Sequence, residues 1–164
     1  MNSIRVVCML LLFLSYGSLK AQNDEELTGL RFEAAKKKNV EGYSAVCRYL
    51  YTIEKYPEEL LIYADSIRQL AVRDKSLNAF LEYYSWKGEA CFMKGDFTSG
   101  FDWKRKALVL AERTKQMGDA VVLCSDIGYY YNVATRYDSA RYYFKKGMYI
   151  ACLLYTSPSP RDTR

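Results

Sequence analysis

The sequence predicts an all-α fold, a solenoid in which antiparallel helical hairpins stack with a period of about 40 residues. The first observation is the stretch Tyr84–Ala111, which has the pattern of two helices joined by a short turn at Lys94–Asp96. The second is a copy of this pattern one period later. The third is the presence of glycines inside the helices, where each costs about 0.5–1 kcal/mol relative to alanine and therefore implies close packing.

The small residues recur in register along the chain. A weaker copy of the pattern precedes them from Tyr43 onward, and an unrelated bundle with accidental spacing is the alternative interpretation. Six small residues, paired 40 positions apart, are expected where neighbouring helices approach most closely: Gly88 and Gly128, Gly100 and Ala140, Ala107 and Gly147.

The pattern resembles the tetratricopeptide repeat (TPR) family over roughly Tyr43–Ala151, because small residues and aromatics alternate on helix–turn–helix units. The period is longer than the roughly 34 residues usual for that family. Arg48, Lys87 and Lys104 stand where the family prefers small, aliphatic or aromatic residues. We expect those positions to be loosely packed or locally solvated.

Four segments follow from this interpretation: a signal peptide at 1–21, an N-terminal capping helix within 22–40, three TPR-like hairpins over 41–151, and a tail at 152–164 that is non-native or disordered. Gly95 is expected to end the fourth helix and Gly118 the fifth. The helices are predicted at 25–38, 43–55, 57–74, 77–94, 98–116, 119–134 and 138–151.

The first 21 residues have the features of a secretory signal peptide, namely Arg5, the apolar run Val6–Leu14 and a small residue at Ala21. Cleavage after Ala21 is expected, with cleavage near Gly17 or Ser18 as an alternative. An uncleaved anchor or a buried helix is the competing interpretation, although the run is shorter than the about 20 residues of a membrane span. The ending Lys20–Gln22 resembles signal peptides of Bacteroidota envelope proteins, so an exported, periplasmic or envelope location is expected.

The other end of the chain departs from the repeat pattern after Ala151. Cys152–Asp162, with the letters CLLYTSPSPRD, resembles the translation of a common transposase sequencing adapter. We therefore expect Cys152–Arg164 to be an artefact, and the natural protein to continue beyond Ala151 as a longer chain. A genuine disordered tail rich in proline and serine is the alternative.

Composition excludes several classes of function. The chain has no histidine, which removes histidine-dependent triads and metal sites, and it contains no phosphate-binding or nucleophile-elbow motif. Its net charge of +5 falls to +2 without the two terminal segments, so the charge gives no argument for nucleic-acid binding. Cys91 and Cys124 are expected to be small buried residues, and no cysteine spacing demands a disulfide. No cofactor, metal or membrane span is expected in the mature fragment.

The resemblance implies a concave groove, lined by the first helix of each hairpin, that holds a partner protein or peptide. The carboxylate clamp of some TPR proteins is not expected, because serine, glutamate and tyrosine occupy its positions. Phe92, Met93 and Val133 could equally be core residues. The groove residues carried over from the family are Tyr49, Ile53, Glu82, Ser85, Glu89, Phe92, Met93, Ser125, Tyr129 and Asn132, together with Ala45, Thr52, Val122 and Val133.

Two functions remain open at this point, and both are binding functions. The first is a scaffold or the periplasmic sensing region of a longer envelope regulator, whose full gene should contain an apolar run of about 20 residues after further repeats. The second is a free-standing periplasmic assembly protein without such a segment. An enzyme is not expected, since no residue pattern in the chain indicates catalysis.

Overall fold

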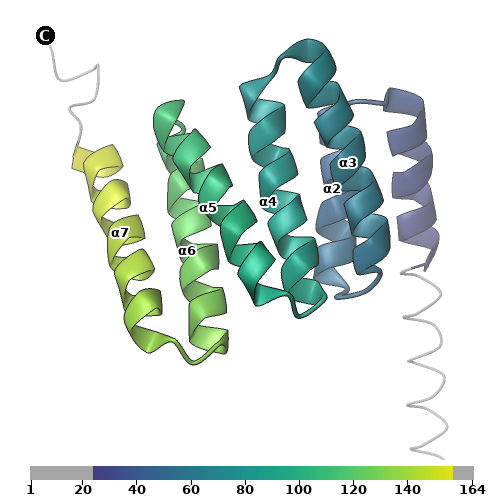
Figure 1. The fold of residues 1–164 in the computed structure, drawn as a ribbon. Coiled ribbons are helices and arrows are strands. Elements are labelled where there is room, and N and C mark those ends of the chain that lie inside the picture. Colours follow the sequence, from purple (N-terminus) through teal and green to yellow (C-terminus); the bar gives the residue numbers. More distant parts are fainter. Residues whose placement is uncertain (1–23, 157–164) are drawn as a thin grey trace, which may run out of the picture.

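The computed structural model describes residues 24–156, and this range is an all-α solenoid in which neighbouring helices pack in succession (Figure 1). The predicted signal peptide and residues 157–164 of the predicted tail lie outside the described residues. A first helix at 24–37 is followed by α2 (Val40–Thr52), α3 (Pro57–Asp74), α4 (Leu77–Met93), α5 (Phe97–Arg113), α6 (Met117–Val133) and α7 (Tyr137–Thr156).

The helix starts repeat with the predicted period. Helices α3, α5 and α7 begin at Pro57, Phe97 and Tyr137, and α4 and α6 begin at Leu77 and Met117, so these equivalent starts are 40 residues apart. Helix α2 departs from the period, because it begins at Val40, 37 residues before α4. Several predicted boundaries are wrong. Helix α2 spans Val40–Thr52 rather than 43–55, so both of its ends lie three residues earlier than predicted, and α5 ends at Arg113 rather than at 116. Helix α7 continues five residues beyond Ala151, to Thr156, and Gly118 lies in the first turn of α6 rather than ending α5.

Local signals explain where the helices begin. The side chains of Asn39, Ser76 and Asp96 each accept a hydrogen bond from the backbone N–H three residues later, which caps α2, α4 and α5. Pro57 occupies the first turn of α3, where its missing N–H costs nothing.

The turns after the helices use left-handed backbone. Gly95 has a φ of 79° after α4, as its sequence position predicts, because glycine adopts this conformation without steric cost. After α5 the left-handed residue is Lys115, with a φ of 58°, not Gly118.

The core is continuous because α4 contributes to two neighbouring clusters. Ala79, Tyr83 and Ala90 pack with helix 24–37, α2 and α3, whereas Leu81 and Phe92 pack with α5, α6 and α7. One face of α4 therefore belongs to the core shared with the preceding helices, and another face belongs to the core shared with the following helices. This helix is the central layer of the stack in Figure 1.

Helix 24–37 covers the open side of the first hairpin. It buries Leu27 and Ala34, and the guanidinium of Arg31 donates two hydrogen bonds to Glu59 on α3, at 2.7 and 2.6 Å. A terminal helix of this kind is needed in a stack of repeats because the outermost hairpin otherwise exposes apolar surface.

Gly88 and Gly128 lie at equivalent positions in successive hairpins. A Cβ added to Gly88 would lie 2.9 Å from Cγ of Lys104, and one added to Gly128 would lie 2.8 Å from the ring of Phe144. Lys104 and Phe144 are themselves one period apart. The second helix of each hairpin thus crosses the first at a residue without a side chain.

At the position of Gly100, the residue that fits depends on the size of the neighbouring side chain. A Cβ at Gly100 would lie 2.5 Å from the ring of Phe92, whereas the equivalent position in the next hairpin tolerates Ala140. The residue equivalent to Phe92 in that hairpin is Asn132, which is exposed. The bulky ring, not the repeat itself, demands the glycine.

The far end of the stack exposes apolar side chains on α7. Leu108 of α5 is only 3% exposed, in a core cluster that includes residues of α6, but its equivalent Met148 on α7 is 64% exposed. Tyr142 and Tyr149 are exposed on the same helix. Among the described residues, no following helix covers α7.

Candidate functional site

Two adjoining cavities form one groove along the first helix of each hairpin. The first, of about 580 Å³, lies mainly between α2 and α4, and the second, of about 280 Å³, lies among α2, α4 and α6. They share Arg48, Leu81, Glu82 and Asp119, so they are continuous. We call this surface the α2–α4–α6 groove; its lining side chains lie within Val40–Tyr51, Asn78–Glu89 and Gln116–Asp126, with Ser76 and Lys104 added.

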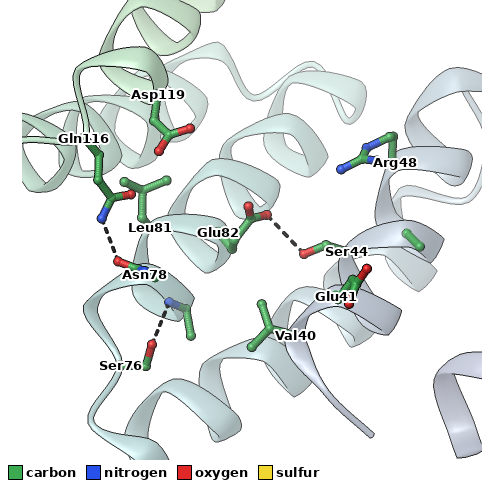
Figure 2. A pocket seen from close by; sticks show the side chains of 12 residues that line it. Val40, Glu41, Ser44, Arg48, Ser76, Asn78, Leu81, Glu82, Gln116 and Asp119 are labelled. Carbon is green, nitrogen blue, oxygen red and sulfur yellow. Dashed lines mark hydrogen bonds between the residues drawn. The ribbon is translucent and has the colours of Figure 1, made fainter. Parts of the chain in front are cut away.

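A hydrogen-bonded triad fixes α2 against α4 at the side of the groove. The Ser44 hydroxyl donates to Glu82 Oε2 at 3.0 Å, and the indole N–H of Trp86 donates to the same oxygen at 2.9 Å. Figure 2 shows Ser44 and Glu82 facing each other across the gap between the two helices. Because Glu82 and Trp86 are four residues apart on one helix, they share a face.

A buried ammonium group forms the floor of the second cavity. Lys104 of α5 is 1% exposed, and its Nζ makes ion pairs with Glu89 of α4 and, at 2.7 Å, with Asp126 of α6. It also donates to the Ser85 hydroxyl at 3.2 Å. Burial alone would lower the pKa of Lys104, but the two carboxylates outweigh it and raise that pKa above its ordinary value.

This arrangement corrects the expectation that Lys104 is loosely packed or solvated. It is fully buried because its stem crosses Gly88 and its ammonium group finds two carboxylates. A signal was present in the sequence. Lys104 lies at helical spacing from Gly100, Ala107 and Leu108, which are all buried, so it occupies a core position of α5.

A second set of hydrogen-bonded side chains extends from the buried Lys104 and Glu89 toward α2. The Tyr130 hydroxyl donates to Glu89 Oε2 at 2.7 Å, and its ring stacks on Phe92 with centroids 3.6 Å apart. Burial, the charge of Glu89 and the neighbouring Tyr51 together raise the pKa of Tyr130 well above its ordinary value. Every oxygen of the buried Glu89 carboxylate is therefore engaged within the fold.

The groove is acidic although the chain as a whole is basic. Its lining contains five carboxylates and two cationic side chains, Arg48 and the buried Lys104. Within residues 24–156, no lysine or arginine nitrogen lies within 4 Å of the carboxylates of Glu41, Glu82 or Asp119. Arg48 is exposed where the two cavities meet.

The structure brings some of the predicted groove residues together. Glu82, Ser85 and Glu89 line the cavities, as do Ala45 and Val122. Glu89 does so as part of the buried floor, because its carboxylate is already bound by Lys104 and Tyr130.

Other predicted groove residues lie elsewhere. Phe92 is a core residue, 5% exposed, and Met93 packs against the core cluster that α4 forms with helix 24–37, α2 and α3. Tyr49 is half-buried beside helix 24–37, where partial burial and the carboxylates of Glu26 and Asp24 raise its pKa. The capping helix therefore covers a side chain that the repeat pattern assigns to the groove.

The remaining predicted residues do not line the two cavities. Ile53 is the half-buried C-cap residue that follows α2. Ser125, Tyr129, Asn132 and Val133 are exposed on α6, and Thr52 is exposed on α2. Tyr49, Glu89 and Tyr129, although one period apart, have different surroundings.

Several groove residues were not foreseen from the sequence: Arg48, Tyr51, Trp86, Asp119 and Asp126. The i,i+4 spacing of Glu82 and Trp86 was a readable signal of a shared face. No local signal identifies Asp126, because its partner Lys104 is 22 residues away.

Three further observations bear on the chemistry of the described part of the chain. Within residues 24–156, no group of three or more cysteine, aspartate or glutamate side chains is placed to hold a metal ion, and no cysteine forms a disulfide. None of the described helices combines the length and the apolar character needed to cross a bilayer. Comparison of the chain with protein-family models, with curated proteins and with solved structures gave no match.

Proposed function

We propose that this chain is a protein–protein interaction module that holds a segment of a partner protein in the α2–α4–α6 groove. The observation that carries the proposal is the continuity of the groove across three successive hairpins. Stacked repeats create extended binding surfaces in this way, because each unit presents its equivalent helix to the same side. The resemblance of the sequence to TPR proteins supports the same assignment.

The walls of the groove are preorganised for binding. Glu82 is held by Ser44 and Trp86, and the floor is held by the ion pairs of Lys104. Side chains that are already fixed lose little conformational entropy when a ligand arrives, so more of the contact energy appears as affinity.

The proposed role is binding without turnover. The chain contains no histidine, and the most buried charged groups, Lys104 and Glu89, bind each other rather than an open cavity. A catalytic lysine would instead need a lowered pKa, whereas that of Lys104 is raised.

At the cellular level, we propose an exported scaffold or the sensing region of an envelope regulator, with a free-standing periplasmic assembly protein as the second candidate. The predicted signal peptide supports export in both cases. The nucleotide sequence of the natural gene distinguishes them. An apolar run of about 20 residues after further repeats supports the regulator, and its absence supports the assembly protein.

Amide hydrogen exchange tests the binding proposal directly. A peptide selected from a displayed random library is added to the full chain, and exchange is compared with and without it. Slower exchange is expected on α2, α4 and α6. Slower exchange confined to α3, α5 and α7, or failure to select any peptide, would contradict the proposal.

A further inference from the structure

We infer that the occupant of the α2–α4–α6 groove is a basic segment of a partner protein, one of whose lysine or arginine side chains enters the second cavity beside Trp86. This inference rests on the proposed binding function and specifies the class of partner.

The charge of the groove is complementary to that of a basic segment. Glu41, Glu82 and Asp119 line the groove without a cation of the described chain within 4 Å, so a cationic partner gains their attraction without first displacing an internal ion pair. The chain as a whole carries a net charge of +5, and the negative charge is therefore a local property of this face.

The second cavity combines aromatic, apolar and acidic side chains. Trp86 and Tyr51 supply aromatic walls, Leu81 and Val122 supply apolar surface, and the carboxylates of Glu82, Asp119 and Asp126 lie around them. A lysine or arginine side chain needs both components, because its stem is apolar and its head is charged. Aromatic faces also attract the cationic head directly.

The buried lysine does not neutralise this cavity. Lys104 supplies one positive charge to two carboxylates, Glu89 and Asp126, so the floor retains a net negative charge. The Asp126 side chain is 32% exposed and remains accessible to a second cation.

Arg48 shapes the preference of the groove. It is exposed where the two cavities meet, so it disfavours a positive side chain at that point and favours a carbonyl or carboxylate group of the partner. The occupant is therefore a segment whose basic side chains lie on both sides of a neutral or acidic position. A uniformly acidic segment is repelled by the carboxylates on either side of Arg48.

Fluorescence anisotropy with three labelled peptides of about twelve residues tests the inference on the full chain. The probes alternate serine with lysine, glutamine or glutamate. The lysine peptide is expected to bind at least about tenfold more tightly than the glutamine peptide, and the glutamate peptide more weakly than both. Raising the salt concentration from about 50 to about 300 mM should weaken the binding of the lysine peptide most, since exposed charges are then screened.

Matched charge variants separate the groove from general electrostatic attraction. The triple variant Glu41→Gln, Glu82→Gln and Asp119→Asn should lower the affinity for the lysine peptide about tenfold, because it removes three negative charges from the groove. The amide oxygen of residue 82 still accepts hydrogen bonds. The control variant is Glu33→Gln, Glu58→Gln and Asp138→Asn, which removes three exposed charges outside the groove. It should change the affinity by less than about twofold.

The outcomes distinguish the inference from the function on which it rests. Equal weakening by the two triple variants overturns the inference, since binding then follows overall charge. Tighter binding of the glutamine or glutamate peptide than of the lysine peptide also overturns the inference. If Val122→Trp, which fills the groove, abolishes that binding, the proposed interaction module is still supported. If no probe and no selected peptide responds to any groove variant, both proposals fail. Thermal melting of each variant verifies that the fold is retained.

Discussion

The ammonium group of Lys104 on α5 lies 2.7 Å from a carboxylate oxygen of Asp126 on α6, and this contact joins the second hairpin to the third. The same ammonium group binds Glu89 on α4. One side chain therefore connects three consecutive helices at the floor of the groove. Stability of the stack and shape of the groove depend on the same interaction.

Replacement of this lysine should strongly destabilise the protein. Lys104→Met keeps an unbranched side chain but removes the ammonium group, which leaves the buried carboxylate of Glu89 without its cation, a change that costs about 3–5 kcal/mol in comparable buried pairs. Urea unfolding of the full chain measures the free energy of unfolding.

Lys145→Met is the matched control, because Lys145 is an exposed lysine on α7 and its replacement should cost less than about 0.5 kcal/mol. Adding Glu89→Gln to Lys104→Met should recover part of the loss, since no unpaired buried charge remains. A loss below about 1 kcal/mol for Lys104→Met alone would contradict the role assigned to this lysine.

Stability should fall at alkaline pH, in part because of Tyr130. Burial and the neighbouring Glu89 raise the pKa of Tyr130 in the folded protein, while in the unfolded chain a tyrosine ionises near pH 10. Above about pH 10 the unfolded state therefore binds fewer protons than the folded state, and stability declines as the pH rises. Below about pH 10 this contribution is fully present.

Melting temperatures between about pH 7 and pH 11 measure this effect. Tyr130→Phe should lower stability at neutral pH by roughly 1 kcal/mol, through the lost hydrogen bond to Glu89, and should make the alkaline decline shallower. Tyr149→Phe changes an exposed tyrosine, and its melting temperature should follow that of the unmodified chain at every pH. An unchanged alkaline slope in Tyr130→Phe would show that this tyrosine is not the linked group.

Two identical glycine substitutions should have opposite effects. In Gly100→Ala the new Cβ would lie 2.5 Å from the ring of Phe92, and the displacement should cost about 1–3 kcal/mol. In Gly29→Ala, within helix 24–37, nothing lies within 4 Å, and alanine should stabilise the helix by about 0.5–1 kcal/mol. Calorimetric melting of both variants measures these changes in stability. An unchanged stability in Gly100→Ala would refute the close approach of α4 and α5.

Most of the fold could be predicted from the sequence because its signals are local. The starts of α3, α4 and α5 depend on Pro57, Ser76 and Asp96, which act within one turn of themselves. The predicted start of α2 at 43 is three residues too late, although Asn39 caps the helix at Val40. The small residues at the helix crossings recur at one period, so each copy supports the assignment of the other. The wrong boundary at Gly118 arose because Lys115 adopts the left-handed conformation without being a glycine.

The candidate site was only partly predictable because its contacts are not local. The partner of Lys104 on α6 lies 22 residues away, and Ser44 and Glu82 are 38 residues apart. Transfer of family positions placed Tyr49 in the groove, whereas the capping helix covers it. Charge pairing between hairpins depends on geometry that a repeat pattern does not specify.

The most direct test of the account compares two valines that are both 58% exposed, Val122 in the groove and Val72 on α3 outside it. Affinity for a selected peptide is measured by titration calorimetry for Val122→Trp and for Val72→Trp. If the groove is the binding surface, Val122→Trp raises the Kd at least about tenfold while Val72→Trp changes it less than about twofold, with similar melting temperatures. Equal effects of the two substitutions, or a loss confined to Val72→Trp, would contradict the central claim.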